Sequence, residues 1–145
     1  MKKILFYSIL ILFVCACNKD KFQTKPQLTV KTSSNIIVAK NSGLEVLLEY
    51  TDKEGDVDDT LYIKKERLNL RTTTTIRDLL KIKVPEFPNR DKGEFQVLLD
   101  YQNYLISALN PPLNEPDTLN LKFVLKDKAG NVSDTVTLSN VIVIR

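Results

Sequence analysis

The chain has 145 residues, with 21 lysines and arginines against 18 aspartates and glutamates, and it contains no histidine or tryptophan. A chain without histidine lacks the commonest general base and the commonest neutral metal ligand. Its near-neutral charge gives no electrostatic argument for binding nucleic acid.

The N-terminal segment, MKKILFYSILILFVCAC, is typical of a secretion signal. Lys2 and Lys3 supply a positive start, and small residues close the segment. The apolar run Ile4–Val14 between them is too short to span a bilayer as a finished helix, which needs about 20 residues. We therefore assign residues 1–16 as a cleaved signal peptide and leave them out of the fold.

The sequence Val-Cys-Ala-Cys at positions 14–17 resembles the bacterial lipobox. The resemblance implies cleavage before Cys17, with acyl chains on its thiol and on its new amino group. Each buried methylene contributes about 0.8 kcal/mol, so more than one chain holds a protein at a membrane. We expect residues 17–27 to be the lipidated N-terminus and a polar tether.

The expected location is the cell envelope, with the protein anchored at the outer membrane on its periplasmic side or at the cell surface. The alternative is an ordinary cleaved signal that leaves a cysteine behind.

Processing at this point would leave the chain without a free thiol, because Cys15 is removed and Cys17 is acylated. A disulfide, a thiolate nucleophile and a cysteine-based metal site are then all excluded. The sequence also has no G-x-S-x-G motif, which marks one large class of hydrolases. We therefore expect no enzyme activity.

Short segments with alternating apolar and polar residues follow the tether, and they predict half-buried antiparallel strands. They lie at residues 28–32, 36–39, 44–50, 61–64, 82–84, 95–101, 119–126 and 136–144. The segment 72–83 is ambiguous, because its apolar residues also fit a short helical turn, although four threonines disfavour a long helix. Residues 103–117 contain three prolines and are expected to form a loop with at most one helical turn.

Seven or eight short strands over residues 28–145 predict an all-β fold, an immunoglobulin-like antiparallel β-sandwich. A small barrel is the alternative. The alternation also predicts which side chains face the core, and these are Val46, Leu48, Val97, Leu99, Leu121, Phe123 and Leu125.

Two stretches share the pattern D-K-x-G-[DN]-V-[DS]-D-T, namely TDKEGDVDDT at 51–60 and KDKAGNVSDT at 126–135. Each connects two predicted strands, and each suits a turn in which Gly55 or Gly130 has positive φ. In an immunoglobulin-like sandwich these stretches would be the B–C and F–G loops, which share one end of the domain. We therefore expect the two loops to be neighbours.

The repeated pattern allows three interpretations. The first is a purely structural turn, in which the carboxylates are exposed and the loss of one changes stability by under about 0.5 kcal/mol. The second is a calcium site, since calcium takes six to eight oxygen ligands. Its candidate ligands are Asp52, Asp56, Asp58, Asp127, Asn131 and Asp134. The third is a rim that recognises a protein or a sugar. The pattern is not an EF-hand, because its glycine stands at the fourth position rather than the sixth.

The two phrases also resemble a pattern in small envelope lipoproteins of Gram-negative bacteria. Such chains carry D-x-x-G-D-[IV] after an early strand and D-x-A-G-N-x-S before the last one, which here correspond to 50–58 and 126–133. The resemblance covers the mature chain, and its second phrase is common in immunoglobulin-like and cadherin-like surface modules. It implies a β-sandwich and no particular activity.

Three classes of function remain open. The first is a lipid-anchored, non-catalytic envelope module for adhesion or protein–protein interaction. The second is a surface module that binds a glycan or calcium through the 51–60 and 126–135 loops. The third is a structural or assembly partner in an envelope complex. In each class the membrane is contacted through the lipid on Cys17, and the envelope protein or glycan is not specified by the sequence.

Lipidation can be tested by replacing Cys17 with Ser. The variant is expected to lose incorporation of labelled fatty acid and to accumulate as an uncleaved precursor, because the thiol is the first acylation site. Metabolic labelling followed by gel electrophoresis measures both effects. Fatty acid still entering the Cys17→Ser protein would contradict the assignment.

Overall fold

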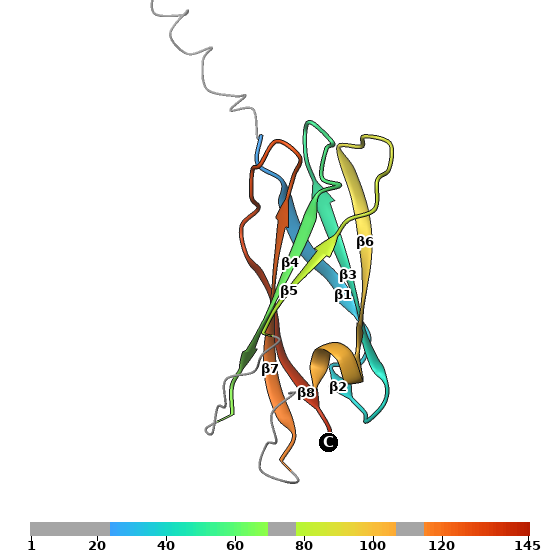
Figure 1. Cartoon of the computed structure of the whole chain (residues 1–145), viewed down its shortest axis with the longest axis vertical. Helices are drawn as coiled ribbons and strands as arrows, with labels where there is room; N and C mark the ends of the chain where they lie inside the picture. Colours follow the sequence, from blue (N-terminus) through green and yellow to red (C-terminus); the bar gives the residue numbers. More distant parts are fainter. Residues whose placement is uncertain (1–23, 70–77, 107–114) are drawn as a thin grey trace, which may run out of the picture.

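The computed structural model describes residues 24–69, 78–106 and 115–145. The predicted signal peptide and Cys17 lie outside these residues. The described residues are mostly strand (Figure 1). In chain order the elements are β1 (Gln27–Ser33), β2 (Ile37–Val38), β3 (Gly43–Thr51), β4 (Thr60–Arg67), β5 (Leu79–Lys83), β6 (Lys92–Asp100), the π-helix η2 (Tyr101–Leu105), β7 (Asp117–Lys126) and β8 (Val136–Val143).

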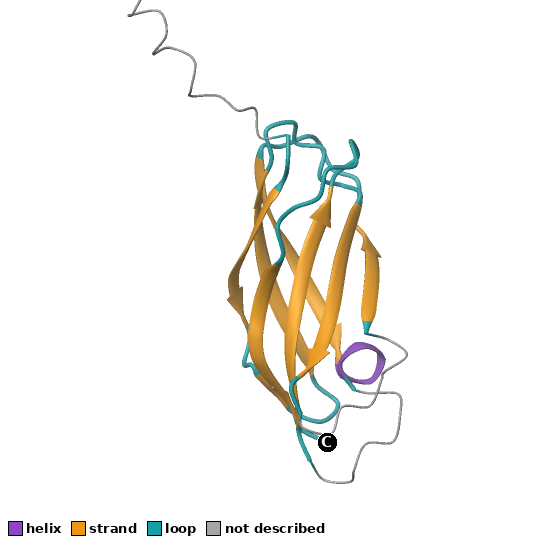
Figure 2. Cartoon of the chain, turned by 90° about the vertical axis from the view of Figure 1, so that its left-hand side faces the viewer, coloured by secondary structure: helices purple, strands orange, loops and turns teal. Residues whose placement is uncertain are grey.

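The strands form two sheets that face each other. One sheet has three strands in the order β1-β3-β6, and the other has five in the order β2-β8-β7-β4-β5. All neighbouring strands pair antiparallel except β2 and β8, which are parallel. Figure 2 shows the strands from the side, with the connecting loops gathered at the ends of the molecule. The all-β class is confirmed, and the alternative of a small barrel is wrong, because the two sheets are separate over the described residues.

A single apolar core fills the space between the sheets. Side chains alternate along β3 and β7, so that Leu48 from one sheet and Phe123 from the other are both fully buried. Because side chains along a strand point to opposite faces, every second residue enters this layer. The predicted core residues are all buried, namely Val46, Leu48, Val97, Leu99, Leu121, Phe123 and Leu125.

The segment 79–83, which the sequence left ambiguous between a strand and a helical turn, is a strand. β5 pairs with β4 in a continuous register from Thr60↔Lys83 to Lys64↔Leu79. This pairing turns Leu80 and Ile82 toward the core, where they pack against the buried cluster. Tertiary pairing therefore overrides the helical spacing of the same apolar residues. Residues 72–77 of the ambiguous segment lie outside the described part of the chain.

The predicted proline-containing loop begins with a single helical turn. Asp100 caps η2 by accepting a hydrogen bond from the backbone N–H of Asn103 at 2.9 Å. Tyr101 and Leu105 in this turn are 1% and 2% exposed, and they extend the core beyond β6. Residues 107–114 of the loop are not described.

A buried ion-pair network lies where β7 begins. The Asp117 carboxylate, in a residue only 1% exposed, forms ion pairs with both Arg67 and Arg145. Two cations on one buried carboxylate offset its desolvation, which would otherwise be costly. The network ties the end of β4, the start of β7 and the segment after β8 together. No helix in the described part of the chain is long and apolar enough to cross a membrane.

Replacing Phe123 with Ala tests the strand alternation. Phe123 is 0% exposed, so the truncation is expected to lower the free energy of unfolding by about 3–5 kcal/mol. Leu79→Ala is the control, because Leu79 is 53% exposed and its loss should change stability by under about 0.5 kcal/mol. Urea unfolding followed by circular dichroism measures both. Equal effects of the two substitutions would contradict the assigned faces.

Candidate functional sites

The two loops with the repeated pattern lie side by side, as the sequence predicts. The first loop, residues 52–59, connects β3 to β4, and the second, residues 127–135, connects β7 to β8. Because β4 and β7 pair with Thr60 opposite Lys126, the first loop ends and the second loop begins at the same end of the five-stranded sheet. The backbone N–H of Lys128 donates to the backbone C=O of Asp56 at 3.0 Å, which joins the loops directly.

Each loop is built around its first aspartate. In the first loop, Asp52 Oδ2 accepts from the backbone N–H of Gly55 at 2.8 Å and of Asp56 at 3.3 Å. In the second, Asp127 accepts from the backbone N–H of Asn131 at 2.7 Å and from its side-chain amide at 2.9 Å. The carboxylates thereby replace backbone acceptors in the turns, as aspartate does in Asx-turns.

Both glycines have the positive φ that the pattern predicts, with values of 69° at Gly55 and 93° at Gly130. Their surroundings differ. A Cβ atom added at Gly55 would lie 2.7 Å from the backbone nitrogen of Arg90, whereas at Gly130 it would meet nothing within 4 Å. Gly55 therefore satisfies both a conformational and a packing requirement, and Gly130 satisfies only the conformational one.

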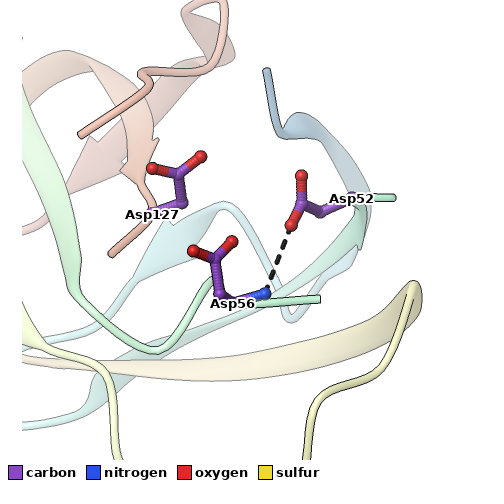
Figure 3. Close-up of side chains that lie close together, drawn as sticks. All are labelled: Asp52, Asp56 and Asp127. Atoms are coloured by element: carbon purple, nitrogen blue, oxygen red, sulfur yellow. Dashed lines mark hydrogen bonds between the residues drawn. The ribbon is translucent and has the colours of Figure 1, made fainter. Parts of the chain in front are cut away.

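Three carboxylates from the two loops converge (Figure 3). Asp52, Asp56 and Asp127 each offer an oxygen, and these oxygens lie within 4.8 Å of one another. Asp52 is 4% exposed and Asp127 is 0% exposed, while Asp56 is half-buried. Within the described residues, Asp52 Oδ1 and Asp56 Oδ1 are buried without a hydrogen-bond partner. Within residues 24–69, 78–106 and 115–145, these three residues could hold a metal ion.

The surroundings of Asp52 disfavour its charged form. Burial raises the pKa of Asp52, and the nearby negative charge of Asp56 raises it further. The backbone N–H groups of Gly55 and Asp56 act in the opposite direction, because they stabilise the carboxylate. Asp52 therefore lies close to two other carboxyl groups in a place that water reaches poorly.

The other three predicted ligands lie outside this group of converging oxygens. Asp58 is 3% exposed and accepts from Lys128 Nζ at 2.7 Å, and this bond lowers the pKa of the Asp58 carboxyl. Asp134 is exposed and pairs with Lys25 at 2.5 Å. Asn131 donates its amide to Asp127. Of the six predicted ligands, the structure brings together Asp52, Asp56 and Asp127.

The expectation of exposed loop carboxylates is wrong for Asp52, Asp58 and Asp127, all of which are buried. The physical reason is that the two loops fold against each other. Carboxylates that accept backbone N–H groups or a lysine bond must then turn inward. Asp134 is exposed, as expected.

A second feature is an apolar groove of about 660 Å³ between β5 and β6. Three rings contribute to its wall: Tyr50 and Phe95 have centroids 4.8 Å apart, and Phe87 lies 6.1 Å from each. The Tyr50 ring covers Gly93, where an added Cβ would come within 2.5 Å of the phenol oxygen. The other lining residues are Leu61, Ile82, Lys83, Val84, Pro85, Glu86, Pro88, Arg90, Glu94, Gln96, Val97, Leu98 and Tyr104.

The groove is flanked by an unpaired strand edge. Among the described strands, β6 pairs only with β3, and hydrogen bonds from Asp52 N to Asp91 O and from Tyr101 N to Ser42 O fix their pairing. In an antiparallel ladder, hydrogen-bonded positions alternate. The odd-numbered residues of β6 therefore bond to β3, and Glu94, Gln96 and Leu98 direct their backbone N–H and C=O groups away from it.

No family model, curated protein or solved structure matches this chain. The functional interpretation therefore depends on the loops and the groove themselves. The groove was not predicted from the sequence. Its sequence signal is the stretch Val-Pro-Glu-Phe-Pro at 84–88, in which two prolines flank an aromatic residue just after a strand.

The two glycines can be compared by replacing each with Ala. Positive φ costs a residue with a Cβ about 1–2 kcal/mol, so Gly130→Ala should lower the free energy of unfolding by that amount. Gly55→Ala should lower it further, because the Arg90 backbone must also move. Chemical denaturation of the two variants and the unaltered protein measures the difference. A loss at Gly130 equal to or larger than that at Gly55 would contradict the geometry of the first loop.

Proposed function

We propose that this protein is a lipid-anchored, non-catalytic module of the cell envelope that binds an extended segment of a partner protein along β6. The single observation behind the proposal is the unpaired edge of β6 beside an apolar groove. Extended peptides bind such edges by adding a strand, with backbone hydrogen bonds for affinity and side-chain pockets for specificity.

The strand order supports an immunoglobulin-like sandwich. In that fold one sheet has the strands A, B, E and D, and the other has C, F and G, with C′ added in some members. β1, β3 and β6 correspond to A, B and E, while β4, β7 and β8 correspond to C, F and G, and β5 corresponds to C′. Residues 84–91, where strand D would be expected, contain no strand. The proposed partner segment would take the place of strand D.

The edge of β6 is better suited than the edge of β5 to pair with an added strand. β6 is nine residues long, contains no proline, and pairs with β3 without a register shift. Its Leu98 side chain is 62% exposed. Long, regular and partly apolar edges invite strand pairing, whereas short edges with lysines resist it. β5 has only five residues, including exposed Lys81 and Lys83. It is therefore the kind of edge that resists strand pairing.

The groove gives the added strand a place for its side chains. Phe95 and Val97 face the core from β6, and both line the groove. Alternate residues of an added strand would point the same way and enter the groove beside them. A volume of about 660 Å³ lies in the range of ordinary ligand pockets. The expected partner segment is therefore extended, with apolar residues at every second position.

The proposal can be tested with two substitutions at Gln96. Gln96→Pro removes the outward N–H without removing a bond to β3, and proline is tolerated at such edge positions. Gln96→Ala is the matched control, because it loses the same side chain but keeps the N–H. A photo-crosslinking residue at Leu98, used in cells with the native membrane, reports what lies against the edge.

The expected result is a crosslinked protein that is retained with Gln96→Ala and lost with Gln96→Pro. Hydrogen exchange adds a second measurement, since the amides of Gln96 and Leu98 should exchange quickly in the isolated protein and slowly in the crosslinked complex. Unchanged crosslinking of a Gln96→Pro variant with an unaltered melting temperature would contradict strand addition at β6.

A further inference from the structure

We infer that Asp52, Asp56 and Asp127 form a calcium site shared by the two loops. The inference is independent of the proposed binding of a partner along β6, which uses a different part of the molecule.

The cluster has unmet bonding capacity as well as negative charge. Asp52 is 4% exposed, and its Oδ1 atom is buried without a hydrogen-bond partner. The Asp56 Oδ1 atom is also buried without a hydrogen-bond partner. A buried acceptor without a partner is costly, and buried carboxylates are normally paired or bound to a metal. A cation bound by both atoms would remove both costs.

The loops hold the carboxylates in place without using all their oxygens. Asp52 is oriented by bonds from Gly55 and Asp56 to its Oδ2 atom, so its Oδ1 atom stays available. Asp127 is oriented by Asn131, whose backbone and side chain each donate to one of its oxygens. Carboxylate oxygens have capacity beyond one bond each. The positions of the ligands are therefore set by the turns before any ion binds.

Oxygen ligands of this kind favour calcium. Calcium takes carboxylate, carbonyl and water oxygens at 2.3–2.6 Å in flexible geometry, whereas magnesium demands near-ideal octahedral geometry at 2.0–2.1 Å. Ligands on opposite sides of a calcium ion can thus be about 5 Å apart, and the three oxygens lie within 4.8 Å of one another. Three carboxylates leave the remaining coordination positions to backbone carbonyls and water.

A bound ion would join the two sheets at one end of the molecule. Asp52 directly follows β3 of the three-stranded sheet, while Asp127 directly follows β7 of the five-stranded sheet. The ion would add a direct link between them to the backbone bond from Lys128 to Asp56.

Thermal melting of the full chain in mild detergent tests the site. The conditions are chelator alone, calcium at about 5 mM, and magnesium at the same concentration. Extracellular calcium modules bind with dissociation constants of about 10⁻⁴–10⁻³ M, so 5 mM calcium should be saturating. A ligand that binds only the folded state stabilises it, and we expect the melting temperature to rise by several degrees with calcium and by much less with magnesium.

Asp56→Asn is the test variant, because the structure shows its carboxylate in the cluster but not as an acceptor in the turn. It should fold and lose the calcium-dependent shift. Asp134→Asn is the matched control from the second loop, where the carboxylate is exposed and outside the cluster; it should keep the shift. Calorimetric titration with calcium gives a direct readout that does not depend on stability, and binding should weaken at least tenfold in Asp56→Asn alone.

Three outcomes would overturn the inference. The first is the absence of both a shift and calorimetric binding in the unaltered protein at millimolar calcium. The second is an equal response to magnesium, which would indicate a general divalent effect. The third is a loss of calcium binding in Asp134→Asn as large as that in Asp56→Asn, which would place the ion elsewhere on the loops.

Discussion

The structure depends on the packing of two sheets with unequal numbers of strands around one core. Neighbouring strands are about 4.8 Å apart, so each strand missing from the smaller sheet leaves a strip of the larger one without cover. At one side β1 contacts β8 and β7 and closes the layer. At the other side nothing in 84–91 forms a strand beside β6. The groove and the free edge of β6 are therefore two aspects of the same imbalance, and the aromatic rings of Tyr50, Phe87 and Phe95 cover part of what it leaves open.

In the acidic loops, the turn and the proposed calcium site would use different oxygens of one residue. From the sequence alone, a structural turn and a metal site are competing interpretations of the same phrase. They are compatible, because Asp52 uses Oδ2 to accept from the turn and its Oδ1 is buried without a hydrogen-bond partner. The same turn that requires Gly55 therefore also sets the position of a carboxylate. A carboxylate fixed in this way loses little conformational freedom when it binds a cation, so the entropic cost of binding is reduced.

Most of the fold could be predicted from the sequence, because the side-chain period of a strand decides which residues face the core. The segments 44–50 and 119–126 alternate almost without exception, and both are strands with the predicted buried face. The structure of the segment 79–83 was harder to predict, since only its pairing with β4 selects strand over helix.

The predicted topology also implied that the two acidic loops lie next to each other. It could not show which of the six candidate ligands converge, because that depends on side-chain directions within each turn. The groove was missed because a strand that is absent leaves no pattern to recognise. The lipid anchor at Cys17 stays a prediction.

The position of β1 has a mechanical consequence. Its first residue, Gln27, pairs with Thr51, and Lys25 just before it bonds to Asp134, so the chain enters the domain at the end that carries the acidic loops (Figure 1). If the N-terminus is held at a membrane and a partner is held along β6, tension between them passes through β1, β3 and β6 in turn. Hydrogen bonds of an antiparallel ladder lie perpendicular to the strands, so a pull along the strand axis shears the six β1–β3 residue pairs together instead of opening them one at a time. The three-stranded sheet would then act as the force-bearing element of the molecule, with its resistance set by the length of the β1–β3 ladder.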